Sequence, residues 1–230
     1  MKGTRHQAFV LSLMLFVTLG LACRSPFLCL ASAQASATPD TFEVSYFSHL
    51  AQSKKAALDE SVRITNPGTS IQVGTNLPEA LCAMIYVFDN TRDLQECCGC
   101  LVSPDELLTL SLETNLTANP LAPTLVFNSG DIEIISALQN GSPCDPTGGG
   151  KLSNGTYALN IFPAPALRAW ATHVNFQSIL GGGTATSVTE EQFEDSTLSS
   201  WELNNAQTLC TLATSVGGGT GVCTCGTIGG

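Results

Sequence analysis

Charged residues are scarce in this sequence, and basic residues are scarcer than acidic ones. Only 12% of the 230 residues are charged, with 9 Lys and Arg against 19 Asp and Glu, whereas soluble domains average about 25%. The pI near 4.5 argues against nucleic-acid binding, because an acidic chain repels phosphate groups. A mean hydropathy of +0.20 argues against a disordered acidic tail, since the chain has ample apolar surface to bury.

Motifs of hydrolytic enzymes are also missing. The sequence has no Gly-x-Ser-x-Gly elbow, and beyond the first 33 residues its only histidines are His49 and His173. His49 falls in a polar leader. His173 lies in a predicted strand in which Trp170, Val174 and Phe176 share one face, so we expect it on the opposite, solvated face. A histidine placed in this way is not a general base, and we assign no catalytic residue.

Exposed binding platforms are equally sparse. Aromatic residues make up 7% of the chain, and we expect both Trp170 and Trp201 in the core. The segment Asp89–Asp93, with Glu96 nearby, offers oxygen ligands for calcium, but it contains an arginine and lacks the glycine and final glutamate of an EF-hand loop. This segment is more simply the turn between two strands. We therefore assign no metal-binding or cofactor-binding residue and expect no cofactor.

The N-terminus has the pattern of a secretory signal peptide. Basic residues within the first six positions precede an apolar run from Ala8 to Ala22, and Ala31-Ser32-Ala33 fits the small-residue cleavage pattern. The run is shorter than the roughly 20 residues that cross a bilayer, and no later segment approaches that length. We therefore predict a signal peptide over residues 1–33, no membrane span, and a secreted, periplasmic or cell-envelope protein.

Two alternatives for the processing site stay open. Ala33-Gln34-Ala35 offers a second cleavage site, and Gly20-Leu21-Ala22-Cys23 is an imperfect lipobox with Gly where Leu is usual. A lipid anchor at Cys23 is the less favoured form. Cleavage after Ala33 removes three of the nine basic residues, so the mature chain is more acidic still, which favours solubility and cation binding.

The mature chain divides into a leader and one domain. Residues 34–60 are rich in Ser and Ala and then mixed polar, so we expect a partly mobile leader. Four apolar residues of this leader could dock a piece of it, namely Phe42, Val44, Tyr46 and Leu50. Residues 61–230 are interpreted as a single domain with a C-terminal helix and a glycine-rich tail.

From Ser61 onward, short segments separated by turn signals predict a series of short β-strands. Leu81–Phe88 is a continuous apolar run typical of a strand buried on both faces, and Leu94–Val102 follows closely enough to be its hairpin partner. Ser103-Pro104-Asp105-Glu106 predicts one helical turn before the next strand. The predicted strands lie near 62–65, 71–73, 81–88, 94–102, 108–112, 125–127, 131–137, 157–162, 167–176 and 187–193.

One helix is predicted near the C-terminus. Ser199 and Glu202 form a capping box. Four residues after it fall on one helical face, namely Leu203, Ala206, Cys210 and Ala213. Many short strands and a single late helix predict an all-β fold, an antiparallel β-sandwich with one C-terminal helix.

Cysteine gives the strongest signal. Eight cysteines follow the signal peptide, and an even number in an exported chain indicates disulfides. Cys97-Cys98-Gly99-Cys100 also contains the C-x-x-C spacing of redox and zinc sites, but it follows a strand instead of opening a helix. Cys223-x-Cys225 has the wrong spacing for a second zinc knuckle. We interpret all eight as disulfide cysteines: Cys82, Cys97, Cys98, Cys100, Cys144, Cys210, Cys223 and Cys225.

The hairpin predicts part of the connectivity. If its two strands pair around Asp89–Asp93, opposed positions sum to about 182, which puts Cys82 opposite Cys100. Cys97 and Cys98 are adjacent, so they point to opposite faces of the sheet and need distant partners. The candidates for those partners are Cys144, Cys210, Cys223 and Cys225.

The segment from Leu81 to Asn90, followed by Gln95–Cys100 and Ser103-Pro104, resembles a group of uncharacterised secreted proteins of acidobacteria. Further matches to the layout of that group are Asn119-Pro120, Cys210 and Cys223-Thr224-Cys225. The resemblance covers roughly Ser61 to Cys225. It implies a bacterial, exported protein with a β fold, and it brings no activity.

These observations favour a secreted, non-enzymatic module with a structural or ligand-binding role and an unknown extracellular or envelope ligand. The alternative is a secreted hydrolase that uses paired carboxylates such as Asp131, Glu133 or Glu190. A hydrolase of that kind requires two carboxylates that face each other across a cleft. The acidic residues expected on a solvated face before the helix are Glu190, Glu191, Glu194 and Asp195.

Overall fold

A computed structural model of the chain describes residues 41–48, 58–72, 74–117, 128–139, 144–148, 162–216 and 223–225. All of them belong to one compact unit, Thr38–Gly230. The predicted signal peptide, His49 and the predicted strand at 125–127 lie outside the described residues, as does most of the predicted strand at 157–162.

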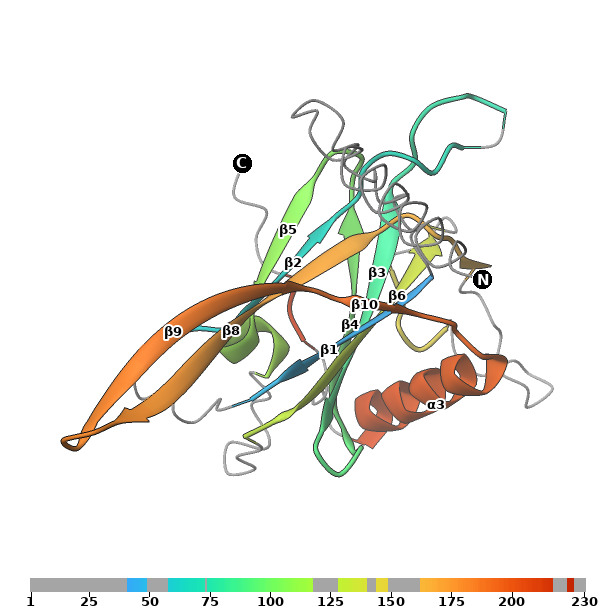
Figure 1. Cartoon of the computed structure of the whole chain (residues 1–230). Coiled ribbons are helices and arrows are strands. Elements are labelled where there is room, and N and C mark those ends of the chain that lie inside the picture. Colours follow the sequence, from blue (N-terminus) through green and yellow to red (C-terminus); the bar gives the residue numbers. More distant parts are fainter. Residues whose placement is uncertain are drawn as a thin grey trace, which may run out of the picture. The chain divides into compact units, whose positions relative to one another are not determined.

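The described residues form two antiparallel sheets and one C-terminal α-helix (Figure 1), which confirms the predicted all-β class. The larger sheet has the order β10-β1-β6-β3-β4, with β7 paired to β6, and the smaller has the order β5-β2-β8-β9. The elements are β1 Phe42–Phe47, β2 Ser61–Thr65, β3 Leu81–Asp89, β4 Leu94–Val102, β5 Leu107–Ser111, the π-helix η1 Leu112–Leu116, β6 Gly130–Leu138, β7 Phe162–Pro163, β8 Arg168–Ile179, β9 Gly183–Gln192, β10 Glu194–Ser196 and α3 Ser200–Val216.

Strand β3 lies in the middle of three layers. Its odd-numbered residues from Leu81 to Val87 belong to the core between the two sheets. Its even-numbered residues from Cys82 to Phe88 pack with Leu203 and Ala206 of α3. Because strand side chains alternate between faces, a strand covered on both sides must be apolar throughout. The continuous apolar run therefore reflects a helix on one face of the sheet and a second sheet on the other.

The leader contributes a strand to the larger sheet. β1 pairs with β6 along its whole length and with β10 at its start. Phe42 and Phe47 are buried in the two cores of the domain. The sheet therefore begins at Phe42, before the boundary that the sequence suggested at Ser61.

The predicted helical turn at residues 103–106 is a β-turn instead. The Glu106 N–H donates to the Ser103 carbonyl at 3.1 Å, and Asp105 has a φ of 62°. A residue in this left-handed region cannot continue a right-handed helix. The capping side chain of Glu106 still accepts the Ser103 N–H at 2.6 Å, so the motif serves the turn rather than a helix. The predicted strand at 71–73 is reduced to an isolated bridge between Ile71 and Pro78.

The predicted orientation of the strand near residues 167–176 is wrong over its first half. Ala169, Ala171 and His173 of β8 are buried, whereas Trp170 is only half-buried. Ala169 and Ala171 pair with Ile64 and Val62 of β2. Those larger side chains already fill this part of the inter-sheet core, so only small side chains fit beside them.

The capping box of α3 forms as predicted, but Trp201 does not enter the core. The Glu202 N–H donates to Ser199 Oγ at 3.1 Å, and the Ser199 N–H donates to Glu202 Oε2 at 2.9 Å. Trp201 precedes the buried Leu203 by two residues, or roughly 200° around the helix. Its side chain is accordingly exposed.

One extra residue in β4 overturns the predicted Cys82–Cys100 pairing. Phe88 pairs with Leu94, but Val87 pairs with Glu96, so the register shifts beside the turn. From there on, Cys82 faces Leu101 and Cys100 faces Ala83. A shift of one residue turns each side chain to the other face, and Cys82 and Cys100 lie in different cores.

Gly99 permits the close approach of the segment around Cys144. A Cβ atom at Gly99 would lie 2.2 Å from the Cys144 carbonyl oxygen. That contact is with backbone that is tied to β3 through the Cys82–Cys144 disulfide, so it cannot move aside freely.

We expect Gly99→Ala to lower the free energy of unfolding by about 1–3 kcal/mol, because overpacking forces backbone shifts. The matched control is Gly183→Ala in β9, whose new methyl group would meet only the end of the Ile179 side chain. Urea unfolding of the two variants measures the difference. Equal midpoints for Gly99→Ala and the wild type would contradict the contact.

Candidate functional site

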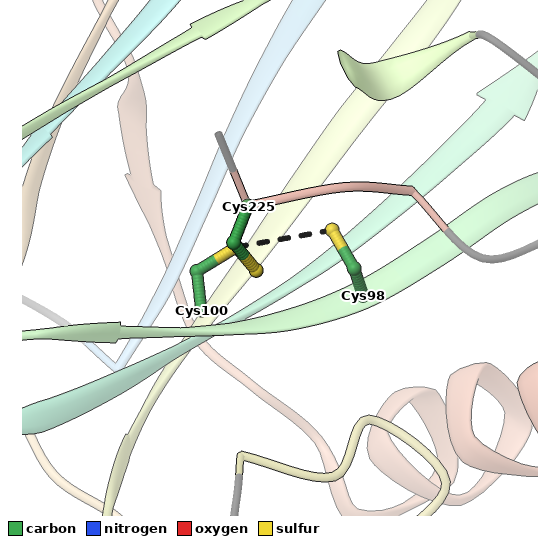
Figure 2. Close-up of side chains that lie close together, drawn as sticks. All are labelled: Cys98, Cys100 and Cys225. Atoms are coloured by element: carbon green, nitrogen blue, oxygen red, sulfur yellow. Dashed lines mark hydrogen bonds between the residues drawn. A yellow bond between two sulfur atoms is a disulfide. The ribbon is translucent and has the colours of Figure 1, made fainter. Parts of the chain in front are cut away.

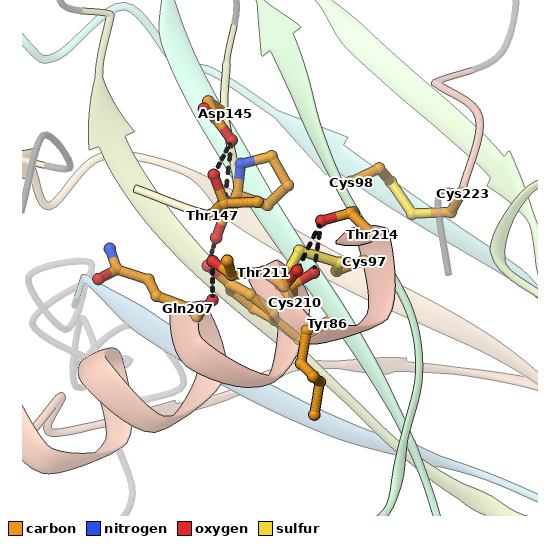
Figure 3. The surroundings of a disulfide bond; sticks show 12 residues. Tyr86, Cys97, Cys98, Asp145, Thr147, Gln207, Cys210, Thr211, Thr214 and Cys223 are labelled. Carbon is orange, nitrogen blue, oxygen red and sulfur yellow. Dashed lines mark hydrogen bonds between the residues drawn. A yellow bond between two sulfur atoms is a disulfide. The ribbon is translucent and has the colours of Figure 1, made fainter. Parts of the chain in front are cut away.

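All eight cysteines of the domain are paired, and β4 takes part in three of the four disulfides. The pairs are Cys82–Cys144, Cys97–Cys210, Cys98–Cys223 and Cys100–Cys225. Figure 3 shows Cys97 directed toward α3 and Cys98 directed away from it, as expected for adjacent residues of a strand. The bridges therefore tie the helix and the C-terminal segment to opposite faces of the same strand.

The sulfur atoms of Cys98, Cys100 and Cys225 form a tight cluster (Figure 2). They lie within 4.8 Å of one another, and the Cys98 and Cys100 sulfur atoms are 4.0 Å apart. The fold thus brings together two Cys-x-Cys pairs whose spacing argued against zinc. A metal requires thiolates, and each of these sulfur atoms is engaged in a disulfide. The cluster is therefore a cross-link in this structure.

The carboxylates of the hydrolase alternative do not converge on one another across a cleft. Asp131 and Glu133 both contact Arg92, with 2.8 Å between Arg92 Nη2 and Glu133 Oε1. Burial raises the pKa of each carboxyl, and the Arg92 charge opposes the rise. Glu190 lies on the smaller sheet, where it forms an ion pair with Arg63. Each of these three carboxylates therefore forms an ion pair with an arginine.

The acidic segment Asp89–Asp93 forms a turn, the interpretation favoured over a calcium site. Asp89 Oδ1 accepts the Thr91 N–H at 2.8 Å and the Asp93 N–H at 3.1 Å. Arg92 has a φ of 68°, and its guanidinium lies 4.7 Å from the centre of the Phe88 ring. These contacts direct Arg92 toward β6 and account for the acidic residues of the turn.

An acid-lined pocket lies where the chain crosses from β9 to β10. Val44 of β1 pairs with Glu194 of β10, but the preceding residues Glu191 and Gln192 belong to the smaller sheet. The crossing chain therefore diverges from β1 and leaves a cavity of about 230 Å³. Its lining residues are Val44, Ser45, Tyr46, Asp131, Glu191, Gln192 and Glu194. Asp131 is already paired with Arg92, so Glu191 and Glu194 supply the net negative charge of this cavity, which favours a positively charged occupant.

His173 lies behind one wall of this pocket, and its burial corrects the expected solvated position. Its side chain is 3% exposed, and its ring stacks on Tyr46 at 4.5 Å. Neither ring nitrogen has a hydrogen-bond partner among the described residues, and Nε2 is 3.7 Å from Glu191 Oε2. Burial lowers the pKa of His173, and Glu191 opposes that shift. The imidazole is therefore neutral at pH 7.

Glu60 is a second buried titratable group on the inner side of Tyr46. Glu60, Tyr46 and His173 border one small cavity of about 10 Å³. Glu60 Oε1 accepts the Val174 N–H at 3.2 Å. Burial raises the pKa of Glu60 to about 7, and the nearby Asp59 adds to the rise. Tyr46 thus separates the open, acid-lined pocket from a buried carboxyl and a buried imidazole.

Sequence reasoning did not assemble this site. The sequence places Tyr46 in the predicted leader, and it places Glu191 and Glu194 on a predicted solvated face. The one available signal was the acidic run at residues 190–195, which contains no basic residue. His173 was found in the sequence, but its face was assigned wrongly.

Comparison with protein-family models, with curated proteins and with solved structures found no match. Among the described residues, no helix has the length and apolar character needed to cross a membrane.

The raised pKa of Glu60 predicts that Glu60→Gln increases the free energy of unfolding, by an amount that grows with pH. Because the folded-state pKa of about 7 lies above the ordinary value of 4.5, ionising Glu60 costs folding free energy as the pH rises from about 4.5 through 7. The variant does not ionise. It should equal the wild type near pH 4.5 and exceed it by up to roughly 3 kcal/mol at pH 8.

Urea unfolding of both proteins across this range measures the difference, in which the titration of His173 cancels. Asp195→Asn, at an exposed carboxylate, serves as the control for the loss of one negative charge. A difference that stays constant between pH 4.5 and 8 would contradict the raised pKa.

Proposed function

We propose that the mature chain is a secreted, non-enzymatic ligand-binding module whose ligand places a cationic group in the acid-lined pocket. The observation that carries this proposal is that Glu191 and Glu194, which form no ion pair with Arg or Lys among the described residues, line one cavity beside the Arg92-paired Asp131. Opposite charges about 4 Å apart near a protein surface attract strongly enough to select a cation over a neutral group.

The size and walls of the pocket support a single ammonium or guanidinium group with an aliphatic stem. At about 230 Å³ it is smaller than the roughly 300–1,000 Å³ of sites for drug-sized ligands. The Tyr46 side chain is 53% exposed and provides an aromatic surface for a cation. Behind Tyr46, the neutral His173 adds no positive charge that would repel the ligand.

Export is supported by the signal-like N-terminus, by four disulfides and by the resemblance to secreted acidobacterial proteins. Disulfides persist in oxidising compartments and are rare in the cytosol.

One observation supports the hydrolase as a second candidate, since Asp131 faces the same cavity as Glu191 and Glu194. The contact between Arg92 and Asp131 weighs against it, because Arg92 occupies this carboxylate and opposes the rise in its pKa that burial produces. Chitosan oligosaccharides are cationic and carry glycosidic bonds. Release of reducing ends from them would establish the hydrolase, and binding without release would support the module.

Removing the pocket charges should weaken cation binding. We expect Nα-acetyl-lysinamide, Nα-acetyl-argininamide or spermidine to bind the mature, oxidised protein at low ionic strength, measured by calorimetry. The double variant Glu191→Gln, Glu194→Gln should bind at least about tenfold more weakly, because two attractive charges are lost.

The matched control is the double variant Asp195→Asn, Glu113→Gln. It removes the same charge from carboxylates that do not line the pocket, so its affinity should stay near that of the wild type. Equal weakening in both double variants would show that net charge, not the pocket, attracts the cation, and would contradict the proposal.

The intact mass of the exported protein tests secretion and disulfide formation together. Material from the culture medium or periplasm should have the mass of a chain that starts at Gln34 less eight hydrogen atoms, since four disulfides form. Reduction should restore those hydrogen atoms. A chain that starts at Cys23 with added acyl mass would establish the lipoprotein instead.

A further inference from the structure

Strand β9 is a long edge that the described residues leave uncovered. The other sheet edges are short or covered: β10 has three residues, β5 has five, and β4 is bridged to the C-terminal segment. That segment also donates a hydrogen bond from Cys223 N–H to the Cys97 carbonyl at 3.2 Å. β9 has ten residues, all exposed. Natural proteins normally protect such edges, because they invite pairing with another strand.

The hairpin of β8 and β9 extends beyond the other strands (Figure 1). Every residue from 177 to 192 is exposed, including the apolar side chains of Ile179, Leu180 and Val188. A two-stranded ribbon alone is only marginally stable in water. A further strand along β9 would give this ribbon the third strand that independent stability requires.

The hydrogen-bond ladder shows which backbone groups of β9 are free to pair outward. The Phe193 N–H donates to the Ala169 carbonyl at 3.0 Å, so this opposed pair is hydrogen-bonded. Hydrogen-bonded and non-hydrogen-bonded pairs alternate along an antiparallel ladder. The even-numbered residues from Thr184 to Gln192 therefore direct their N–H and C=O groups away from β8.

We propose that the occupant of this edge is a second copy of the chain, whose β9 pairs antiparallel with the first across a twofold axis. The residues from Gly183 to Thr189 are uncharged and include three Thr and one Val, residue types that favour strands. They contain no Lys or Pro of the kind that blocks an edge. The two charges of β9, Glu190 and Glu191, lie together at its end.

Charge and the ladder together select the register. Outward-directed residues must oppose each other, which allows Thr186 opposite Val188 with Ser187 on the axis. This register pairs nearly all of β9 and places Glu190 opposite Thr184 of the second copy. The two Glu190 side chains are then separated along the strand by six residues, or about 20 Å, which exceeds the Debye length of about 8 Å at physiological salt. A parallel arrangement would instead place them side by side.

The same arrangement provides a surface for the exposed tip of the hairpin. With Ser187 on the axis, Gly183 of one copy lies beside Glu191 of the other. Leu180, in the turn that precedes Gly183, therefore reaches the base of the β8–β9 hairpin of the second copy. Each copy contributes one β9, so the pairing closes as a dimer and does not propagate. This inference does not depend on the proposed ligand, since it concerns the outer edge of the hairpin.

The test is the mass of the mature, oxidised protein in solution over a range of concentrations, measured by sedimentation equilibrium. The wild type should approach twice the monomer mass, and added salt should favour the dimer because both copies are acidic. Thr186→Pro removes an outward N–H without loss of a bond to β8, so it should remain monomeric at every concentration. Thr186→Ala keeps that N–H and should behave as the wild type.

Two further measurements keep the proposal falsifiable if the proline variant folds poorly. Val188→Lys places two positive charges near the axis and should also abolish the dimer. Ser187→Cys should form an intermolecular disulfide on oxidation, because non-hydrogen-bonded partners lie about 4.5 Å apart, whereas Ser178→Cys on β8 should not. A wild type that is monomeric throughout, or a dimer that Thr186→Pro and Val188→Lys leave intact, would overturn the proposal.

Discussion

The alternation of side chains along four residues of β4 is the constraint on which the rest of the domain depends. Cys97 reaches α3 on one face, while Cys98 and Cys100 reach the C-terminal segment on the other. Gly99 between them leaves the space into which the backbone of Cys144 fits. In the chain-entropy model, each of these bridges, which close loops of 113 or 125 residues, contributes about 5 kcal/mol. The periphery of the domain is thus fixed by a single strand.

The main elements follow from local patterns in the sequence. The apolar run of β3, the hairpin to β4 and the capping box of α3 all depend on neighbouring residues. The pairing of Cys82 depends on more than spacing, because the extra residue at Gln95 shifts the register and no local pattern marks it. Trp170 and His173 exchanged their expected faces, since the identity of β8's partner strand decides which side chains fit the core.

The pocket could not be read from the sequence for a different reason. Tyr46 of β1 lies opposite Asp131 of β6, and Glu191 of β9 joins them only because the chain changes sheets between β9 and β10. Arg92 and Arg63 are both paired with carboxylates, so they do not neutralise Glu191 and Glu194. The charges of Glu191 and Glu194 therefore produce a negative electrostatic potential in the pocket beside β1.

The separation of the disulfide partners along the chain sets the order in which the four bridges can form. Three of the four bridges join β4 to Cys210, Cys223 or Cys225, with separations of 113 and 125 residues. If the chain is exported N-terminus first, as proposed, the three thiols of β4 enter an oxidising environment with only each other, Cys82 and later Cys144 as partners until Cys210 arrives. Correct pairing therefore requires that these thiols stay reduced, or that early disulfides are exchanged, until the C-terminal cysteines are available. A chain truncated before Cys223 would have no correct partner for two of them.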